Sequence, residues 1–350
     1  MDEAEFKLYK TLAEAGDAAA QNLLGTMYQN GKGVSPSDAE AAKWYFAAAQ
    51  QGHADAQNNI GFMYQNGRGI KQDDSEAASW YVTAALQGHA AAQNNLGQMY
   101  QNGDGVVQDY KEAVKWYLKA AQQDYAVAQN NLGLMYQNGE GVEQSDSEAL
   151  KWYRKAAEHG NADAHNNLGW MCQNGRGVKQ DETEAFKWYL KAAEHGHAGA
   201  QNNLGWRYQH GKGVPQDYAK AIKWYRKAAE QGHAAAQNNL GLIYSKGLQD
   251  YIESARWFLK AAEQGISIAQ FNMGVIHEEG KGLQKDLATA EMWYREAAEQ
   301  GYADAQYALG RLYMMGEGVE KDDTEALNWF GKAAEQGHAE AQTQLAKMSK

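Results

Sequence analysis

The sequence predicts an all-α fold, a right-handed α-solenoid of about nine helix-turn-helix repeats with half-repeats at both ends. Three observations lead to this prediction. One unit of sequence recurs every 36 residues, each unit contains two segments whose apolar residues have helical spacing, and no segment alternates apolar and polar residues with period two. Units of this kind bury their apolar faces against their neighbours, so a stack of them shares one continuous core.

Tryptophan marks the register of the repeat. Successive markers lie 36 residues apart except for one interval of 33, and they are Trp44, Trp80, Trp116, Trp152, Trp188, Trp224, Trp257, Trp293 and Trp329. This register places nine repeats in residues 18–338. Residues 4–16 match the second half of a unit and residues 339–348 match the first half. We therefore expect one solenoid domain over 1–350 with capping helices at 1–17 and 339–350.

Each unit is expected to contain two helices. The first, helix A, carries apolar residues at i, i+3 and i+4, as in Leu96, Met99 and Tyr100. The second, helix B, carries the marker tryptophan, and we expect Trp116 and Tyr117 on its buried side. Glycine follows both helices, because it tolerates the left-handed conformation that ends many helices. The Gly-x-Gly pairs after helix A are therefore interpreted as turns and not as phosphate-binding loops.

Composition and charge narrow the classes of function. The net charge of -11 argues against nucleic acid and against an anionic membrane surface as partners. No apolar stretch approaches the ~20 residues of a membrane span, so we expect no membrane insertion. The acidic start of the chain has no apolar segment typical of a signal peptide, which favours a cytoplasmic protein, or an exported or periplasmic one if a leader was removed. The oligomeric state stays open.

The repeated text Ala-x-Ala-x-x-x-Leu-Gly-x-x-Tyr-x-x-Gly-x-Gly-Val, followed by Ala-x-x-Trp-Tyr-x-x-Ala-Ala-x-x-Gly, resembles the Sel-one-like repeat (SLR) family, a relative of the tetratricopeptide repeats. The resemblance covers essentially the whole chain. It implies a curved superhelix whose concave face is lined by A helices, and a role as scaffold or adaptor in protein-protein interaction. One branch of the family is cysteine-rich, with penicillin-binding or β-lactamase activity in some members. This chain departs from that branch because its only cysteine is Cys172.

No constellation in the sequence predicts catalysis, a metal or a cofactor. Cys172 replaces a tyrosine of the apolar stripe, which indicates a buried thiol. A column of histidines follows the glycine that ends helix B, and it consists of His53, His89, His197, His233 and His338. Stacked helices lie about 8–10 Å apart, while zinc needs bonds of about 2 Å. The histidines are therefore interpreted as turn residues.

Three columns of helix A are expected to form a ligand-binding groove. A variable place directly after the helix A glycine holds the apolar residues Phe62, Leu134, Trp170 and Trp206. Four residues earlier lies an asparagine column, which includes Asn94, Asn130, Asn166 and Asn202. Three residues later lies a glutamine column, which includes Gln173 and Gln209. These offsets place the columns on one helical stripe, facing away from the apolar stripe. Recent duplication is the alternative explanation of the repeated Asn and Gln.

The leading hypothesis is a protein- or peptide-binding scaffold. Carboxamides of successive A helices would pair with the backbone of an extended chain, and the aromatic residues would act as anchors. Two alternatives remain, a hydrolase acting on a cell-wall or β-lactam substrate, as in the cysteine-rich relatives, and a glycan-binding protein, because Trp with Asn and Gln also suits sugars.

Two irregularities interrupt the repeat. Arg207 stands in an apolar column otherwise filled by methionine in the preceding units, so it needs a carboxylate nearby or an exit to solvent. The unit between Trp224 and Trp257 is three residues short, and its hairpin geometry should therefore differ. Beyond it the groove columns change, with Phe271 and Tyr307 in place of Asn, and Glu278 and Met314 in place of Gln. We therefore expect a carboxamide-lined groove over roughly residues 18–240 and a differently surfaced C-terminal part.

Overall fold

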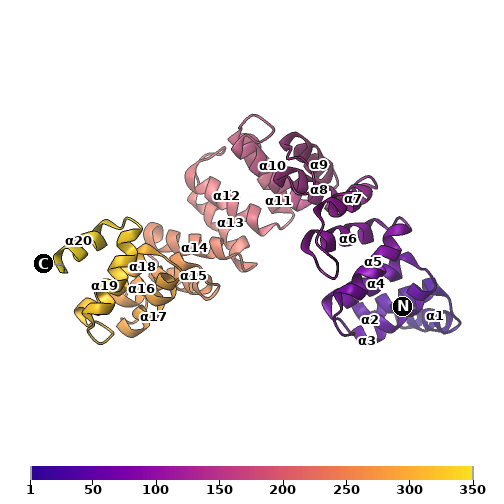
Figure 1. The fold of residues 1–350 in the computed structure, drawn as a ribbon, viewed down its shortest axis with the longest axis horizontal. Coiled ribbons are helices and arrows are strands. Elements are labelled where there is room, and N and C mark those ends of the chain that lie inside the picture. Colours follow the sequence, from indigo (N-terminus) through magenta and orange to yellow (C-terminus); the bar gives the residue numbers. More distant parts are fainter. Residues whose placement is uncertain (1, 349–350) are drawn as a thin grey trace. The chain divides into compact units, whose positions relative to one another are not determined.

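The computed structural model describes residues 2–348, and every regular element in that range is a helix (Figure 1). The all-α prediction is confirmed. Two helices flank the repeats, α1 (Asp2–Glu14) and α20 (Ala339–Met348). The A helices are α2 (Ala18–Asn30), α4 (Ala54–Asn66), α6 (Ala90–Asn102), α8 (Ala126–Asn138), α10 (Ala162–Asn174), α12 (Ala198–His210), α14 (Ala234–Leu242), α16 (Ser267–Glu279) and α18 (Ala303–Met315). The B helices are α3 (Asp38–Gln50), α5 (Asp74–Leu86), α7 (Tyr110–Ala121), α9 (Asp146–Glu158), α11 (Glu182–Glu194), α13 (Tyr218–Glu230), α15 (Tyr251–Glu263), α17 (Leu287–Glu299) and α19 (Asp323–Glu335).

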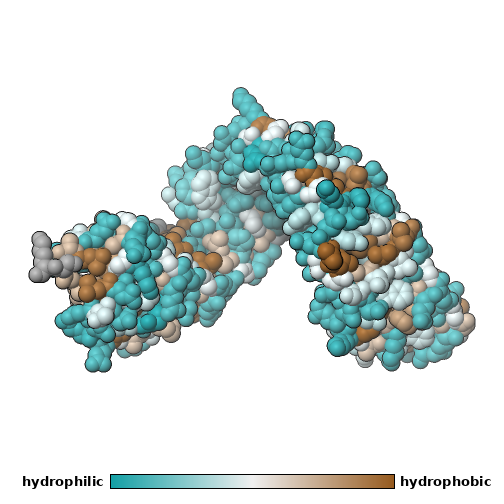
Figure 2. All heavy atoms as spheres, viewed as in Figure 1, coloured by the Kyte–Doolittle hydropathy of each residue, from teal (hydrophilic) through white to brown (hydrophobic). Residues whose placement is uncertain are grey.

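The chain divides into two compact units. The first ends at Asp181 and contains α1 to α10, and the second begins at Glu182 and contains α11 to α20. Within each unit, a B helix packs against the A helix that precedes it and the A helix that follows it. The visible surface of both units is mainly hydrophilic and carries small, separate groups of apolar residues (Figure 2). Among the described helices, none combines the length and apolar character that crossing a membrane requires.

The shortened repeat has the altered hairpin that its sequence predicts. Helix α14 ends at Leu242 and continues as a π-helix over Ile243–Leu248, and Gln249 then adopts the left-handed conformation with φ of 56°. The three missing residues are thus absorbed by a wider helical turn. The division between the two units does not fall here, since it separates helix A from helix B of the fifth repeat.

The aromatic residue at the centre of each repeat is the one that follows the marker tryptophan. These side chains are buried, and they are Tyr45, Tyr81, Tyr117, Tyr153, Tyr189, Tyr225, Phe258, Tyr294 and Phe330. The expectation that the marker itself is a core residue is wrong for most repeats, because only Trp257 and Trp329 are buried. The other indoles cover the edge of the core. In the third repeat, for example, the Lys119 ammonium lies 3.9 Å from the Trp116 ring centroid.

The glycine in the middle of helix A makes room for this central ring. A Cβ added at Gly97 would lie 2.7 Å from the Tyr117 ring, which is shorter than any normal contact. The same conflict exists at seven further A-helix glycines, Gly25, Gly61, Gly133, Gly205, Gly241, Gly274 and Gly310, and α20 carries Ala346 at the corresponding place. The Leu-Gly pair of the repeat therefore reports a close approach of helix A to helix B.

The second glycine of the Gly-x-Gly turn joins neighbouring repeats. Gly105 has a φ of 66°, and a Cβ there would lie 2.1 Å from the carbonyl oxygen of Asp74, the first residue of α5. The turn of one repeat therefore rests on the start of helix B of the repeat before it. Its role is structural, as the recurrence in the sequence indicates.

Two unusual residues have the environments that their sequence positions predict. Cys172 is buried in the apolar stripe of α10. Arg207 is also buried, and its Nη1 donates to the Glu182 carboxylate at 2.7 Å and to the carbonyl oxygens of Glu182 and Lys212 at 3.3 Å. The guanidinium carbon lies 4.9 Å from the Tyr189 ring centroid. A buried cation is tolerable because a carboxylate and two carbonyl groups surround it.

Candidate binding surface on the A helices

The variable column carries three exposed aromatic side chains of the A helices. Phe62, Trp170 and Trp206 are 39%, 37% and 40% exposed, which is unusual for rings of this size, and Leu134 is half-buried. Trp170 belongs to the first unit and Trp206 to the second, so each is considered within its own unit. The Trp206 indole stacks on His210 of the same helix, with ring centroids 4.5 Å apart. Three of these four residues are the most exposed members of the expected groove.

The asparagine column links successive A helices. Asn131 Nδ2 donates to Asn94 Oδ1 at 3.0 Å, and Asn167 Nδ2 donates to Asn130 Oδ1 at 2.9 Å. The same bond recurs elsewhere, from Asn59 to Asn22, from Asn95 to Asn58 and from Asn239 to Asn202. Each donor is the second residue of an Asn-Asn pair and reaches back to the preceding A helix.

Burial of this column differs from the sequence expectation. Asn94 and Asn130 are only 3% and 5% exposed, so treating them as open groove residues is wrong. Asn166 and Asn202 are half-buried. The physical reason is the short spacing between A helices, which lets one carboxamide bridge to the next and takes both out of water.

The glutamine column accepts hydrogen bonds from the central tyrosines. Tyr153 OH donates to Gln137 Oε1 at 2.6 Å, and Tyr225 OH donates to Gln209 Oε1 at 2.8 Å. Burial raises the pKa of the Tyr153 and Tyr225 hydroxyls, which keeps them protonated as donors. Gln173 occupies the same column and is half-buried. The column therefore satisfies a buried hydroxyl in the core of the first four repeats and of the sixth.

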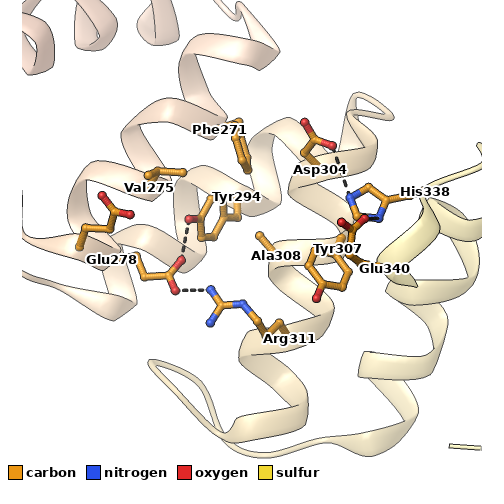
Figure 3. A pocket seen from close by; sticks show the side chains of 11 residues that line it. Phe271, Val275, Glu278, Tyr294, Asp304, Tyr307, Ala308, Arg311, His338 and Glu340 are labelled. Carbon is orange, nitrogen blue, oxygen red and sulfur yellow. Dashed lines mark hydrogen bonds and ion pairs between the residues drawn. The ribbon is translucent and has the colours of Figure 1, made fainter. Parts of the chain in front are cut away.

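The last three repeats change this pairing. In the seventh repeat Ser245 stands in the glutamine column, and the central ring is Phe258, which has no hydroxyl. Tyr294 OH donates at 2.7 Å to Glu278, which replaces glutamine (Figure 3). In the ninth repeat the acceptor becomes Met314, and the central ring loses its hydroxyl and becomes Phe330. Ring and acceptor thus change together, as expected if the two side chains form one buried pair.

The same columns form a pocket of about 460 Å³ in the second unit (Figure 3). Phe271, Val275 and Glu278 of α16 supply one side, while Tyr307 and Arg311 of α18 supply another. The remaining lining residues are Glu279, Tyr294, Asp304, Ala308, His338 and Glu340. The sequence analysis did not include these residues in the site, although the replacement of Asn and Gln by aromatic and charged residues was a usable signal.

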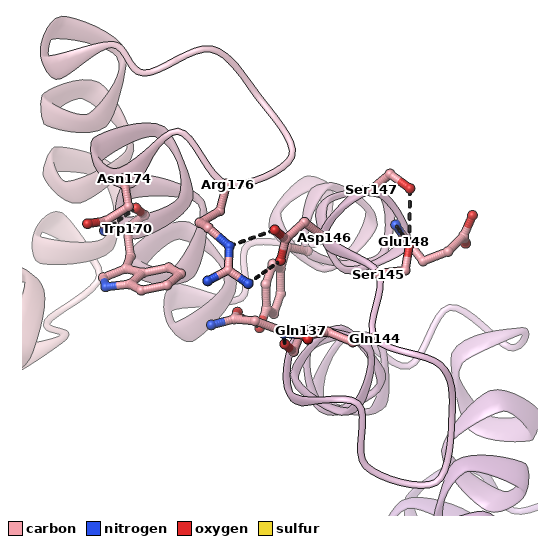
Figure 4. A network of polar contacts seen from close by, with 10 residues as sticks. Gln137, Gln144, Ser145, Asp146, Ser147, Glu148, Trp170, Asn174 and Arg176 are labelled. Atoms are coloured by element: carbon pink, nitrogen blue, oxygen red, sulfur yellow. Dashed lines mark hydrogen bonds and ion pairs between the residues drawn. The ribbon is translucent and has the colours of Figure 1, made fainter.

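Trp170 has an arginine beside it. The Arg176 guanidinium binds the Asp146 carboxylate through two bonds, of 2.6 Å from Nε and 3.0 Å from Nη2, and this pairing raises the pKa of Arg176 (Figure 4). The Arg176 guanidinium carbon lies 6.0 Å from the Trp170 ring centroid. Asn174 Nδ2 also donates to the Trp170 carbonyl oxygen at 2.8 Å. The loop after α10 is thus tied to the start of α9 next to the exposed ring.

Phe62, like Trp170, is followed by an arginine that pairs with an aspartate. Arg68 follows it by six residues, as Arg176 follows Trp170, and binds Asp38 through Nε at 3.1 Å and Nη2 at 2.8 Å. Within the first unit, no other variable place among the described residues is followed by arginine at this spacing. The sequence contained this signal, an aromatic residue with arginine six positions later, but it is visible only after the columns are aligned.

Histidine in the turn before helix A caps that helix. His89 Nδ1 accepts a hydrogen bond from the Ala92 amide at 3.1 Å, and its Nε2 lies 3.0 Å from the Asp55 carboxylate of the preceding A helix. Asn161 does the same for α10, with 2.8 Å between Ala164 N and its Oδ1. Between residues 2 and 348 no group of three or more His, Cys, Asp and Glu side chains is arranged to hold a metal ion.

Stacked pairs of helices with a recurring sequence define a helical-repeat protein. Nine consecutive segments of the chain match the Sel1 repeat, and they are residues 18–53, 54–89, 90–125, 126–161, 162–197, 198–233, 234–266, 267–302 and 303–338. The chain therefore belongs to the Sel1 repeat family, whose members commonly mediate protein-protein interactions and are typically non-enzymatic scaffolds.

Solved structures agree with this assignment. A Sel1 repeat protein from Oxalobacter formigenes is 34% identical, with a TM-score of 0.65 over 87% of this chain and 90% of the other. The protein c5321, a protective antigen present in uropathogenic Escherichia coli strains and displaying an SLR fold, is also 34% identical, with a TM-score of 0.56 over 98% of this chain and 90% of the other. No curated protein matches the chain.

Proposed function

We propose that this chain is a non-catalytic scaffold or adaptor that binds a segment of a partner protein along its A helices. The observation that carries the proposal is the exposure of Phe62, Trp170 and Trp206 in a column that the repeat core does not use. Rings of this kind supply most of the binding energy where proteins meet. Leu134 extends the same column with a half-buried apolar side chain.

The carboxamide side chains determine which hydrogen-bonding groups the surface offers to a ligand. Gln137 and Gln209 use their oxygens to accept from buried tyrosines, so their N–H groups are what they offer to a ligand. A bound chain would then be held by its backbone carbonyl groups. Asn94 and Asn130 contribute by fixing the spacing of the A helices, while Asn166, Asn202 and Gln173 continue the two columns beside the tryptophans.

The test is a peptide library displayed against the full chain, followed by measurement of Kd for the selected peptides. Phe62→Ala with Trp170→Ala, both in the first unit, should weaken binding by about 2 kcal/mol or more, roughly 30-fold. Trp206→Ala measures the contribution of the second unit separately.

The matched control changes two exposed residues of the B helices, Lys151→Ala with Lys187→Ala, whose salt bridges to Glu148 and Glu184 lie at the surface. If the lysine pair weakens binding and the aromatic pair does not, the contact surface is on the B helices and the proposed site is wrong. Binding to a glycan array, with no peptide selected, would favour the glycan-binding alternative instead.

A further inference from the structure

We infer that the pocket formed by α16, α18 and α20 binds the guanidinium group of an arginine side chain on the partner protein. The inference rests on the proposed function, because it assigns a ligand chemistry to the A-helix face of the last two repeats. It concerns the second unit alone, where all eleven lining residues lie between Phe271 and Glu340.

The pocket has the size and walls of a side-chain site. Its volume of about 460 Å³ falls within the range of small-ligand pockets. Phe271 and Tyr307 are half-buried and present aromatic rings, and Val275 and Ala308 add apolar surface between them. The Tyr307 ring is held in place by stacking on His338, with ring centroids 4.7 Å apart. A flat ligand can therefore lie against a ring that is already fixed.

An ion pair within the pocket is satisfied inside the protein. Arg311 Nη2 pairs with one oxygen of Glu278, and Tyr294 OH donates to the other oxygen at 2.7 Å (Figure 3). Both carboxylate oxygens of Glu278 are thus occupied, and the charge of Arg311 is balanced. This pair adds no net charge to the pocket.

Three further carboxylates give the pocket an excess of negative charge. The side chains of Glu279, Asp304 and Glu340 are 46%, 54% and 69% exposed, so an incoming group can reach them. Glu279 lies 2.8 Å from Lys281, but an exposed pair of this kind is weak and exchanges readily. Four carboxylates against one guanidinium leave three negative charges when histidine is neutral, and this favours a cationic ligand.

His338 lies between two of these carboxylates. Its Nδ1 accepts from the Ala341 amide at 3.3 Å, which caps α20. Its Nε2 lies 3.4 Å from Asp304, and Nδ1 lies 3.4 Å from Glu340 (Figure 3). Each carboxylate meets the imidazole through one oxygen, so both keep acceptor capacity for a ligand.

Guanidinium fits this combination better than ammonium. It is planar and weakly hydrated, stacks on aromatic rings, and presents its N–H groups as a fork that matches carboxylates. Tyr307 supplies the ring, and Asp304 and Glu340 supply acceptors from two different elements. An ammonium group is a compact, strongly hydrated charge that gains less from the ring face.

The test uses the full chain and three blocked tripeptides, N-acetyl-Gly-Arg-Gly-amide and its lysine and citrulline counterparts, titrated by calorimetry. Citrulline has the shape of arginine without its charge. We expect the arginine peptide to bind with Kd on the order of a millimolar, the citrulline peptide at least tenfold more weakly, and the lysine peptide in between. Asp304→Asn with Glu340→Gln should weaken arginine binding at least tenfold.

Asp55→Asn is the matched control for Asp304→Asn. Asp55 holds the same place in its repeat and contacts His89 Nε2, but Asn58 and Phe62 stand there instead of the pocket residues. This control should leave arginine binding unchanged. Equal affinity for arginine and citrulline, an unchanged Kd in the Asp304→Asn, Glu340→Gln variant, an equal loss in the control, or no binding of the arginine peptide would each overturn the inference.

Failure of the inference and failure of the proposed function give different results. If selected library peptides still depend on Phe62 and Trp170 while the arginine peptide does not bind, only the pocket assignment falls. If the arginine peptide binds through Asp304 and Glu340 while no library peptide depends on Phe62 and Trp170, the proposed role of the two aromatic residues is wrong. The assignment of the pocket is then still supported.

Discussion

In the first unit, glutamines of the A helices accept from tyrosines of the B helices, asparagines bridge successive A helices, and the aromatic residues Phe62 and Trp170 are exposed. In the eighth and ninth repeats of the second unit, the same three columns hold Phe271, Val275 and Glu278 on one helix and Tyr307, Arg311 and Met314 on the next. The helix bounds and the central buried ring are alike in both regions. Surface chemistry can therefore change while the packing of the repeat is kept.

The pairing of ring and acceptor shows how such a change is made. Where the acceptor is a long polar side chain, as with Gln137 or Glu278, the ring keeps its hydroxyl. In the seventh repeat the short Ser245 replaces glutamine, and the ring is Phe258. Where the acceptor becomes Met314, the ring is Phe330. A buried hydroxyl without an acceptor would lose its hydrogen bonds to water without replacement, so the two positions are constrained as a pair.

The largest expected effect tests whether each region depends on its own buried central ring. Tyr153→Ala in the first unit and Phe330→Ala in the second should each lower the free energy of unfolding by about 3–5 kcal/mol, because each empties a buried site. Denaturant titration, with hydrogen exchange to locate the loss, measures this. Trp152→Ala should cost less because its indole is only half-buried, and a greater loss there would contradict the assignment of the core.

The next effect concerns the close approach of helix A to helix B. Gly97→Ala and Gly310→Ala should each cost about 1–3 kcal/mol, since the new Cβ would lie 2.7 Å from Tyr117 and 2.8 Å from Phe330. Thermal and chemical denaturation measure the change. Gly331→Ala is the control, because nothing lies within 4 Å of a Cβ there, and it should stabilise the protein by about 0.4–1 kcal/mol. Equal destabilisation by all three would show that the loss does not come from the contact with the central ring.

A smaller effect is expected when the hydroxyl is removed from the central ring of the first region or added to that of the second. Tyr153→Phe should cost about 1 kcal/mol because Gln137 loses its donor, and Phe330→Tyr should cost a similar amount because Met314 offers only a weak acceptor. Adding Met314→Gln to Phe330→Tyr should restore the stability. A double-mutant cycle measures the coupling, and zero coupling between positions 314 and 330 would show that the two residues vary independently.

The smallest effect is a pH dependence confined to one helix cap of the second unit. Burial lowers the pKa of His233 below its ordinary value of 6.5, and neighbouring His197 lowers it further. The unfolded chain then binds a proton more readily, so the contribution of His233 is complete above pH 6.5 and is lost as the pH falls through the lowered pKa. His233→Asn keeps a capping oxygen, as Asn161 does for α10. The variant should lose less stability than the parent between about pH 7.5 and 5, and equal losses in denaturant titrations would remove His233 as the cause.

The fold was accessible from the sequence because it depends on local patterns. Apolar spacing, the glycines after each helix and the 36-residue register are properties of short segments. The choice between Trp152 and Tyr153 as the central ring was not accessible in this way. Both lie on helix B about 100° apart, and only the packing of the neighbouring A helices decides which one is enclosed.

The candidate site, too, has features that the sequence predicts and features that only the stacked helices determine. The spacing of the columns correctly placed Phe62, Trp170 and Trp206 at the surface of helix A, because the repeat core imposes no residue there. The same spacing could not show that Asn94 and Asn130 are buried. Their partners lie on the neighbouring helix, at a distance that only the stacked structure sets.

The sequence by itself determined the repeat, its helices, its turns and the exposed aromatic column, since each follows from periodicity and from the conformational range of glycine. The tertiary structure decided which polar groups are used internally and which remain for a ligand. Gln137 is committed to a buried hydroxyl, whereas Asp304 and Glu340 remain accessible around a pocket lined by residues of four helices. A hydrogen bond needs both partners within about 3 Å, and residues far apart in sequence reach that distance only when the repeats stack.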